Sequence, residues 1–274
     1  MKKIYFLLIL AILLIIPTSV KAAPVNSKFK DDTLYECIIN SLNQEKINGK
    51  EDRNISYVVT DDELSQLKVL NCSGYNKEAK VKDTTGIDSM INLTNLQLQY
   101  NEVSNIDVSK LTNLERYYAF ENKLTNIDVT KNTKLKVLSV DTNELTSIDI
   151  SNNPLLEYLS VQKNKLTSIN VNNNVNLKEL YLEDNQLTDL DVSNNVNLEV
   201  LKISNNKLKK EVDASKNTKL TTYVHENSLE EIKEPNIENP QTGDLPIVMI
   251  SILGIMAIMY IYYIFYKNKK TQVQ

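Results

Sequence analysis

A 21-residue repeat constrains the fold of this 274-residue chain more than any other feature of its sequence. Six copies follow one another without a gap, and each opens on a leucine, from Leu93 to Leu198, with apolar or aromatic residues three and five positions later. Residues 220–232 read as a worn terminal copy. Repeats of this length predict a solenoid, because each copy buries its apolar side chains only against its neighbours. The most regular position holds asparagine in every copy: Asn101, Asn122, Asn143, Asn164, Asn185 and Asn206.

The repeat unit, L-x-x-L-x-L-x-x-N-x-L, resembles the signature of leucine-rich repeats. Its L-x-L part alternates with a period of two, as a short strand does, and the asparagine is expected to satisfy backbone groups where the chain leaves the strand. The return stretch, for example residues 148–153, is too short for a long helix. The predicted fold class is therefore a leucine-rich repeat solenoid of the α/β class, with short parallel strands and mostly extended or turn return segments.

Residues 23–86 are expected to form a helical N-terminal cap and a degenerate first repeat, ahead of leucine-rich repeats over residues 87–232. Asp32 is the expected N-cap of a first helix, whose apolar residues follow the i, i+3, i+4 spacing. Thr60 and Glu63 match a capping box at the start of a second helix. The cap also contains both cysteines of the chain, Cys37 and Cys72, which form either one disulfide or two buried thiols.

Both ends of the chain read as targeting segments. A basic start, a 13-residue apolar run (Ile4–Ile16) and small residues near position 22 predict a signal peptide over residues 1–22. Residues 233–242 form a short stalk, and residues 243–274 hold a 22-residue, mostly apolar span (Leu245–Tyr266) with lysines behind it. This span is long enough to cross a bilayer, with its lysine-rich end in the cytoplasm.

The order of motif, apolar span and basic tail resembles the cell-wall sorting signal of Gram-positive surface proteins. The resemblance implies that sortase cleaves after Thr242 and joins Thr242 to peptidoglycan, so that the chain is held in the membrane only before sorting. The alternative is a plain single-pass membrane anchor that sortase does not process. The motif is similar to the sortase consensus Leu-Pro-any-Thr-Gly, with asparagine in place of leucine, and consists of Asn239, Pro240, Gln241, Thr242 and Gly243.

The 21-residue period and the return segment I-D-V-S-x-N resemble the internalin-like proteins of Gram-positive bacteria over about residues 87–232. The resemblance is strongest to a subgroup that carries a cysteine at the second strand position. It implies a surface-displayed binding protein without naming a partner. No cysteine ladder is expected here, because that position holds Leu98, Ala119, Val140, Val161, Leu182 and Ile203.

Charge and composition exclude several classes of function. Removing the six lysines and one acid outside residues 23–242 from the totals of 31 Lys+Arg and 35 Asp+Glu leaves a net charge of −9, which argues against nucleic-acid binding. The single histidine, His225, lacks any nucleophile motif around it. Aspartates recur in the return segments, at Asp107, Asp128, Asp149, Asp191 and Asp213. Their carboxylates could bind calcium or cap turns by accepting backbone N–H groups, and we expect turn capping. We therefore predict no enzyme and no catalytic, cofactor-binding or metal-ligating residue.

Strand side chains that point away from the core predict a ligand-binding face on the concave side of the solenoid. Exposed aromatic residues with a polar rim are typical of interaction sites. The predicted function is a cell-wall-anchored, non-catalytic adhesin or receptor for an unknown protein or glycan; the alternative is a scaffold or sensor of the cell envelope. The predicted face consists of Arg116, Tyr118, Phe120, Tyr158, Tyr181, Glu183 and Lys202.

Overall fold

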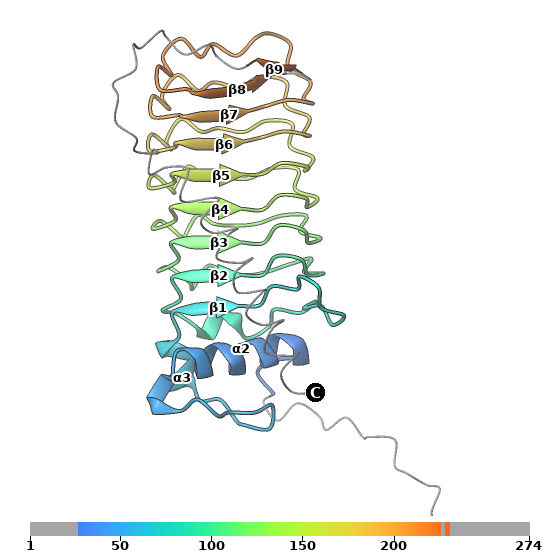
Figure 1. Ribbon diagram of the computed structural model, residues 1–274, viewed down its shortest axis with the longest axis vertical. Helices are drawn as coiled ribbons and strands as arrows, with labels where there is room; N and C mark the ends of the chain where they lie inside the picture. The colour runs from blue at the N-terminus through green and yellow to red at the C-terminus, as the bar shows by residue number, and fades with distance from the viewer. Residues whose placement is uncertain (1–26, 226–227, 231–274) are drawn as a thin grey trace, which may run out of the picture. The chain divides into compact units, whose positions relative to one another are not determined.

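The computed structural model describes residues 27–225 and 228–230, in which strands stack one above another and helices lie at the N-terminal end of the stack (Figure 1). The elements in chain order are α2 (Asp32–Gln44), η1 (Ile47–Gly49), α3 (Asp61–Gln66), β1 (Val69–Asn71), η2 (Ile87–Ser89), β2 (Asn95–Gln97), β3 (Arg116–Tyr118), β4 (Val137–Ser139), β5 (Tyr158–Ser160), β6 (Glu179–Tyr181), β7 (Val200–Lys202), β8 (Thr222–His225) and β9 (Ser228–Glu230).

Strands β1 to β8 pair in parallel and in sequence order, which confirms the predicted parallel-strand solenoid. The register follows the repeat, since Leu96 pairs with Tyr117 and Tyr117 with Leu138. The sequence analysis did not predict β9, which pairs antiparallel with β8. Between strands the chain returns through turns and extended backbone, as the short return segments indicate.

One hydrophobic core runs through the described residues. It extends without interruption from Phe29 beside α2 to Val212 near the last coils. A continuous core of this kind is what an independently folding domain requires. The middle residues of strands β2 to β7 are fully buried: Leu96, Tyr117, Leu138, Leu159, Leu180 and Leu201.

The repeated asparagine column forms a ladder of hydrogen bonds between coils. In Asn164, the amide Nδ2 donates to the carbonyl oxygens of Val140 (3.0 Å), Val161 (3.0 Å) and Gln162 (3.1 Å). Its Oδ1 accepts from the backbone N–H of Leu145 at 3.0 Å. One side chain thus satisfies four backbone groups from two coils, which would otherwise be buried without partners.

The residue before each ladder asparagine adopts a left-handed backbone conformation. These φ values lie between 50° and 60°, although none of the residues is glycine. Non-glycine residues avoid this region because the Cβ atom crowds the backbone, so the asparagine hydrogen bonds must hold the turn in place. The residues are Tyr100, Glu121, Thr142, Lys163, Asp184 and Asn205.

A second asparagine ladder, which the sequence analysis did not predict, lies in the return turns. Asn174 is representative, because its Nδ2 donates to the carbonyl oxygens of Ile150 (3.0 Å) and Asn153 (2.9 Å) in the preceding coil. The turns that lead into the strands are therefore held by side-chain amides as well. The members are Asn132, Asn153, Asn174, Asn195 and Asn217, all buried.

Two columns of alternating charge also run from coil to coil. One column directly follows the first asparagine ladder, and the other directly precedes the strands. Exposed pairs of this kind contribute only about 0–1 kcal/mol each. The ion pairs in these two edge columns are Glu102–Lys123 (2.8 Å), Glu144–Lys165 (2.8 Å), Glu115–Lys136 (2.9 Å) and Glu157–Lys178 (2.7 Å).

The N-terminal helices begin close to where the sequence predicts them. The capping box at α3 is present, with both reciprocal hydrogen bonds between Thr60 and Glu63. The N-cap of α2 is Asp31, so the expected Asp32 was wrong by one residue. Asp31 is favoured because its second oxygen also accepts the backbone N–H groups of Lys82 and Asp83. That these helices act as the solenoid cap stays a prediction, as do the predicted domain boundaries.

A disulfide joins Cys37 in α2 to Cys72, directly after β1, across a Cα–Cα distance of 5.3 Å. Both residues are buried, and α2 packs against β1. The bridge therefore ties the helical segment to the first strand of the sheet. It closes a sequence separation of 35 residues, and closure of such a loop typically stabilises a domain by roughly 2–4 kcal/mol.

A buried ion pair between Arg53 and Glu63 holds the loop between α2 and α3. Arg53 Nη2 lies 2.9 Å from Glu63 Oε1 and donates to the carbonyl of Ile47. Tyr57 Oη donates to the same carboxylate at 2.7 Å. Burial favours the neutral acid, but hydrogen bonds from Thr60, Tyr57 and Arg53 outweigh it and lower the pKa of Glu63 to about 2. The carboxylate is therefore charged at neutral pH.

The predicted targeting segments lie outside the described residues. These are the signal peptide, the sorting motif with Thr242, and the apolar span Leu245–Tyr266. Among the residues that are described, none of the helices has the length and apolar character needed to cross a membrane.

Replacing a ladder asparagine is expected to destabilise the solenoid. Asn164→Ala should lower the free energy of unfolding by about 1–3 kcal/mol, because it leaves buried backbone groups without partners. Asn152→Ala is the matched control, since Asn152 is exposed in a turn, and it should change stability by no more than about 0.5 kcal/mol. Urea unfolding monitored by circular dichroism measures both values, and equal losses would contradict the ladder's role.

Replacing Glu63 is expected to destabilise the protein in a pH-dependent way. At neutral pH, Glu63→Gln leaves Arg53 buried without its counter-charge, and we expect a loss of about 3–5 kcal/mol. Because the folded pKa is about 2, below the ordinary 4.5, the stabilisation is present above pH 4.5 and disappears as the pH falls toward 2. The melting temperatures of the two proteins should therefore converge on acidification.

The control for this experiment is Glu144→Gln, which removes the same charge from an exposed pair with Lys165. It should change the stability by less than about 1 kcal/mol at every pH. A constant difference between Glu63→Gln and the native protein from pH 7 to pH 2 would contradict the prediction.

Candidate binding surface

The solvent-facing side chains of strands β2 to β7, together with the first residue after each L-x-L segment, form a surface that we call the strand face. Along each strand these side chains alternate with the buried core residues, as period-two geometry requires. Of the seven predicted face residues, Arg116 is exposed, and the other six are half-buried. Ring and cation contacts place Tyr158, Tyr181 and Lys202 in one group and Phe120 in a second group. Arg116 and Tyr118 lie on the same side of β3 and take part in neither set of contacts.

The first group joins strands β5, β6 and β7. The rings of Tyr158 and Tyr181 lie 5.4 Å apart between centroids, and Lys202 Nζ lies over the Tyr181 ring at 5.4 Å from its centroid. The hydroxyl of Tyr181 donates to Glu179 Oε2 at 2.7 Å. Burial raises the pKa of both tyrosines, so both hydroxyls stay neutral. The three side chains thus form a preorganised aromatic and cationic surface.

Carboxylates surround this aromatic group. Asp141 accepts hydrogen bonds from Ser139 Oγ (2.6 Å), from Ser160 Oγ and from the backbone N–H of Gln162 (3.1 Å). Burial raises the pKa of Glu183, and a hydrogen bond from its own backbone N–H and then the positive charge of Lys202 partly oppose this shift. Glu183 Oε2 is buried and has no hydrogen-bond partner among the described residues.

The middle of the strand face is less exposed than the sequence indicates. Alternation along the strands predicts that every second side chain, here called an outward position, lies in solvent. Ser160 is fully buried and Ser139 is 5% exposed, although both occupy outward positions. Their hydroxyls donate to Asp141, which holds them within the surface. Gln99, at another outward position, is likewise only 4% exposed. Between the aromatic groups, Ser139, Asp141 and Ser160 therefore form a layer of hydrogen-bonded side chains.

The second aromatic group contains two tyrosines that the sequence analysis missed. Phe120 contacts Tyr100, with ring centroids 5.1 Å apart, and Tyr100 contacts Tyr75 at 5.0 Å. Tyr75 is 61% exposed. Tyr100 occupies the left-handed position before the ladder asparagine, and this backbone turn brings its ring toward Phe120 and Tyr75. The sequence signal that could have identified this group is the aromatic residue, Tyr100, at the position before the ladder asparagine.

The recurrent aspartates of the return segments cap turns. Each accepts the backbone N–H of the residue two positions later, at 2.9–3.0 Å, and Asn170 takes the same part in its coil. In the described part of the chain, no group of three His, Cys, Asp or Glu side chains is placed to hold a metal ion. The capping aspartates are Asp107, Asp128, Asp149, Asp191 and Asp213.

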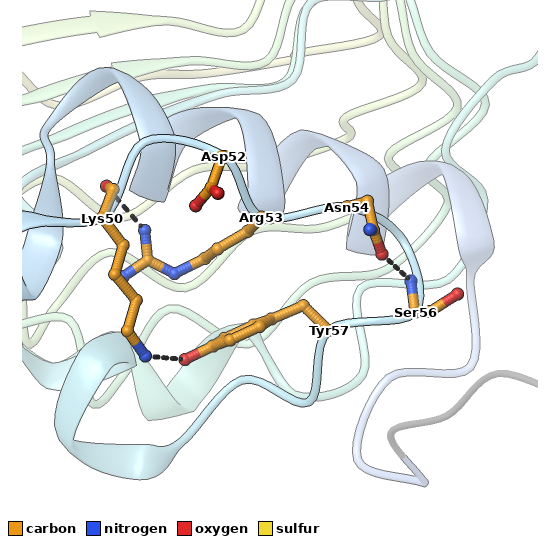
Figure 2. Close-up of a pocket in the computed structure, with 6 residues that line it drawn as sticks. All are labelled: Lys50, Asp52, Arg53, Asn54, Ser56 and Tyr57. Atoms are coloured by element: carbon orange, nitrogen blue, oxygen red, sulfur yellow. Dashed lines mark hydrogen bonds between the residues drawn. The ribbon is translucent and has the colours of Figure 1, made fainter.

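The two remaining features do not add reactive groups to the strand face. His225 lies in β8, and its ring stacks on Tyr223 at 6.2 Å between centroids. An open pocket in the loop between α2 and α3 is lined by Lys50, Arg53 and Tyr57 among others (Figure 2). Lys50 Nζ donates to Tyr57 Oη at 2.8 Å, and Arg53 Nη1 donates to the carbonyl of Lys50 at 2.9 Å. These bonds are internal to the loop, so we assign the pocket a structural role.

Comparison with solved structures shows which proteins share this architecture. The chain is 34% identical to the functional domain of InlJ from Listeria monocytogenes, with a TM-score of 0.66 over 72% of this chain and 41% of that one. It thus spans less than half the length of the InlJ structure. That domain is described as including a cysteine ladder, whereas the corresponding column here contains none.

Two more distant structures share the fold alone. Internalin C2 of Listeria monocytogenes is 21% identical, with a TM-score of 0.56 over 74% of this chain and 96% of that one. A leucine-rich repeat protein of Leptospira interrogans is 22% identical, with a TM-score of 0.54 over 63% and 51%. No family model and no curated protein matches the sequence. The structural neighbours are thus internalins and other leucine-rich repeat proteins. They support the identification of this chain as an internalin-like leucine-rich repeat protein.

Proposed function

We propose that this chain is an exported, non-catalytic surface protein that binds a partner, a protein or a glycan, through its strand face. It acts as an adhesin or receptor displayed on the cell wall. The observation that carries the proposal is the Tyr158–Tyr181–Lys202 group, which holds aromatic rings at the solvent side of a rigid sheet. Tyrosine rings on rigid elements bind partners at a low entropic cost, and they dominate binding hot spots. The similarity to the functional domain of InlJ supports an internalin-like, non-catalytic binding protein.

The strand face is also suited to binding by its construction. Its side chains project from strands that pair with a neighbouring coil on each side, and their positions are further restricted by hydrogen bonds such as Tyr181 to Glu179. A surface that is ordered before binding loses less conformational entropy when the partner arrives.

Removing the two tyrosine rings is expected to weaken binding without unfolding the solenoid. Tyr158→Ala/Tyr181→Ala should weaken the affinity for the partner by about 2 kcal/mol or more, as loss of hot-spot residues does. Partners are first identified on protein and glycan arrays with residues 23–242, and affinities are then measured by calorimetry. Thr167→Ala/Thr188→Ala is the matched control, because these exposed residues lie in the same coils on the return side. Equal affinity of both variants would contradict the proposal.

We also propose that sortase attaches the chain to peptidoglycan through Thr242. The sortase cysteine attacks the Thr242 carbonyl to form a thioester, and Gly243 leaves as a free amine. An amine of peptidoglycan then attacks the thioester, forms an amide with Thr242 and releases the cysteine thiol. Pro240 supports the first step because it keeps itself and Asn239 in extended, non-helical backbone. The apolar span would hold the precursor at the membrane until transfer. The proposal rests on the resemblance of residues 239–270 to a sorting signal.

Replacing Thr242 is expected to stop wall attachment. Thr242→Ala should leave the protein in the membrane fraction with its C-terminal tail, whereas the native chain should be released by wall digestion and end at Thr242. Thr218→Ala, in an exposed turn of the repeats, should be sorted normally. Mass spectrometry of wall-digested material measures the C-terminus, and a native peptide that continues through Gly243 into Leu245 would indicate a plain membrane anchor.

A further inference from the structure

Two sets of carboxylates on the repeats differ in their partners, those of the edge columns and those of the strand face. Those of the edge columns are neutralised by lysines one coil away, as in Glu144–Lys165 and Glu157–Lys178. Those of the strand face are not, since no ion pair of the described residues includes Asp141, Glu179 or Glu183. The strand face around Tyr181 therefore holds three carboxylates against a single lysine, Lys202.

Among these three carboxylates, Glu183 has a buried oxygen without a hydrogen bond in the described part of the chain, so it is the group to which a partner could bind. Its carboxylate lies next to the Tyr181 ring and near Asp141. Lys202 is close enough to influence it, yet Lys202 Nζ lies over the Tyr181 ring and forms no ion pair with Glu183. A buried carboxylate oxygen without a hydrogen bond costs folding free energy, and such costs are commonly kept where a site serves binding.

Lys202 itself shows which chemistry this surface accepts. Its ammonium group lies 5.4 Å from the centroid of Tyr181, within the range of a cation–π interaction. The Tyr158 ring lies beside Tyr181 and has no cation over it among the described residues. A second cation at this position would meet two tyrosine rings and the carboxylates of Asp141 and Glu183. A guanidinium group suits such a site, because it stacks on rings and binds carboxylates through paired hydrogen bonds.

We infer that the strand face around Tyr158, Tyr181 and Glu183 binds a basic segment of a partner protein, and that an arginine or lysine side chain of this segment occupies the site. The inference rests on the proposed function and specifies the chemistry of the partner. Charge complementarity selects this occupant, since a neutral glycan would leave the carboxylates unpaired and an acidic partner would be repelled.

The experiment measures binding of a fluorescent arginine-rich peptide, in a glycine-serine background, to residues 23–242. Peptides with glutamine or glutamate in place of arginine serve as probes of charge. We expect the arginine peptide alone to bind, with an affinity that falls as the salt concentration rises. Glu183→Gln should weaken binding by about tenfold or more, because it removes the counter-charge. Its melting temperature should equal or exceed that of the native protein.

The matched control is Glu144→Gln, which removes the same charge from an edge column, and it should change the affinity by less than about twofold. Equal weakening by both variants would show attraction to the overall negative charge and would overturn the inference. Absence of arginine-peptide binding, with a glycan bound in a manner that needs Tyr158 and Tyr181, would also overturn it while leaving the proposed function intact. If no array partner depends on the two tyrosines, both proposals fail.

Discussion

Each coil leaves its strand through a residue in the left-handed conformation, and the asparagine that follows supplies the hydrogen bonds of the turn. Asn164 shows the arrangement, with three carbonyl groups and one N–H satisfied by a single amide. Aspartate has no N–H donor and alanine has no polar side-chain group, so neither could replace asparagine in this turn. The parallel strands, the core columns and the strand face all follow from these turns, because the turns set where each coil meets the next.

The asparagine ladder and the strand register were predictable because each depends on a position that recurs every 21 residues. The second ladder also recurs every 21 residues, from Asn132 to Asn195, and the column before it does not, since it holds Lys131 in one coil and Asn173 in another. The same pattern could therefore have revealed it, although turns such as residues 172–174 contain several asparagines. The Arg53–Glu63 pair lies in a segment without repeats, where no pattern relates the two positions. Asp31 and Asp32 are equivalent in sequence, and a contact with residues 82 and 83, far along the chain, selects Asp31.

The sequence predicts which side chains lie on the strand face, but it does not predict which of them contact one another. Period two places Tyr158 and Tyr181 on the solvent side, and adjacent coils bring their rings together. The burial of Ser139 and Ser160 depends on Asp141, one column away, which accepts both hydroxyls. Tyr75 and Tyr100 were missed because the position before the ladder asparagine is not part of the strand alternation, and only the left-handed turn directs Tyr100 toward Phe120.

The charge pattern of the edge columns repeats every two coils, whereas the fold repeats every coil. Acidic and basic residues alternate over four successive coils of one column, in the order Glu102, Lys123, Glu144 and Lys165, before Gln186 ends the alternation. Deleting one coil would bring Glu102 against Glu144, and like charges on neighbouring coils repel. Deleting two coils would restore a glutamate beside a lysine. Shortening or lengthening of this protein by recombination is therefore least costly in even numbers of repeats, and descendants with an odd change would need compensating charge substitutions along both columns.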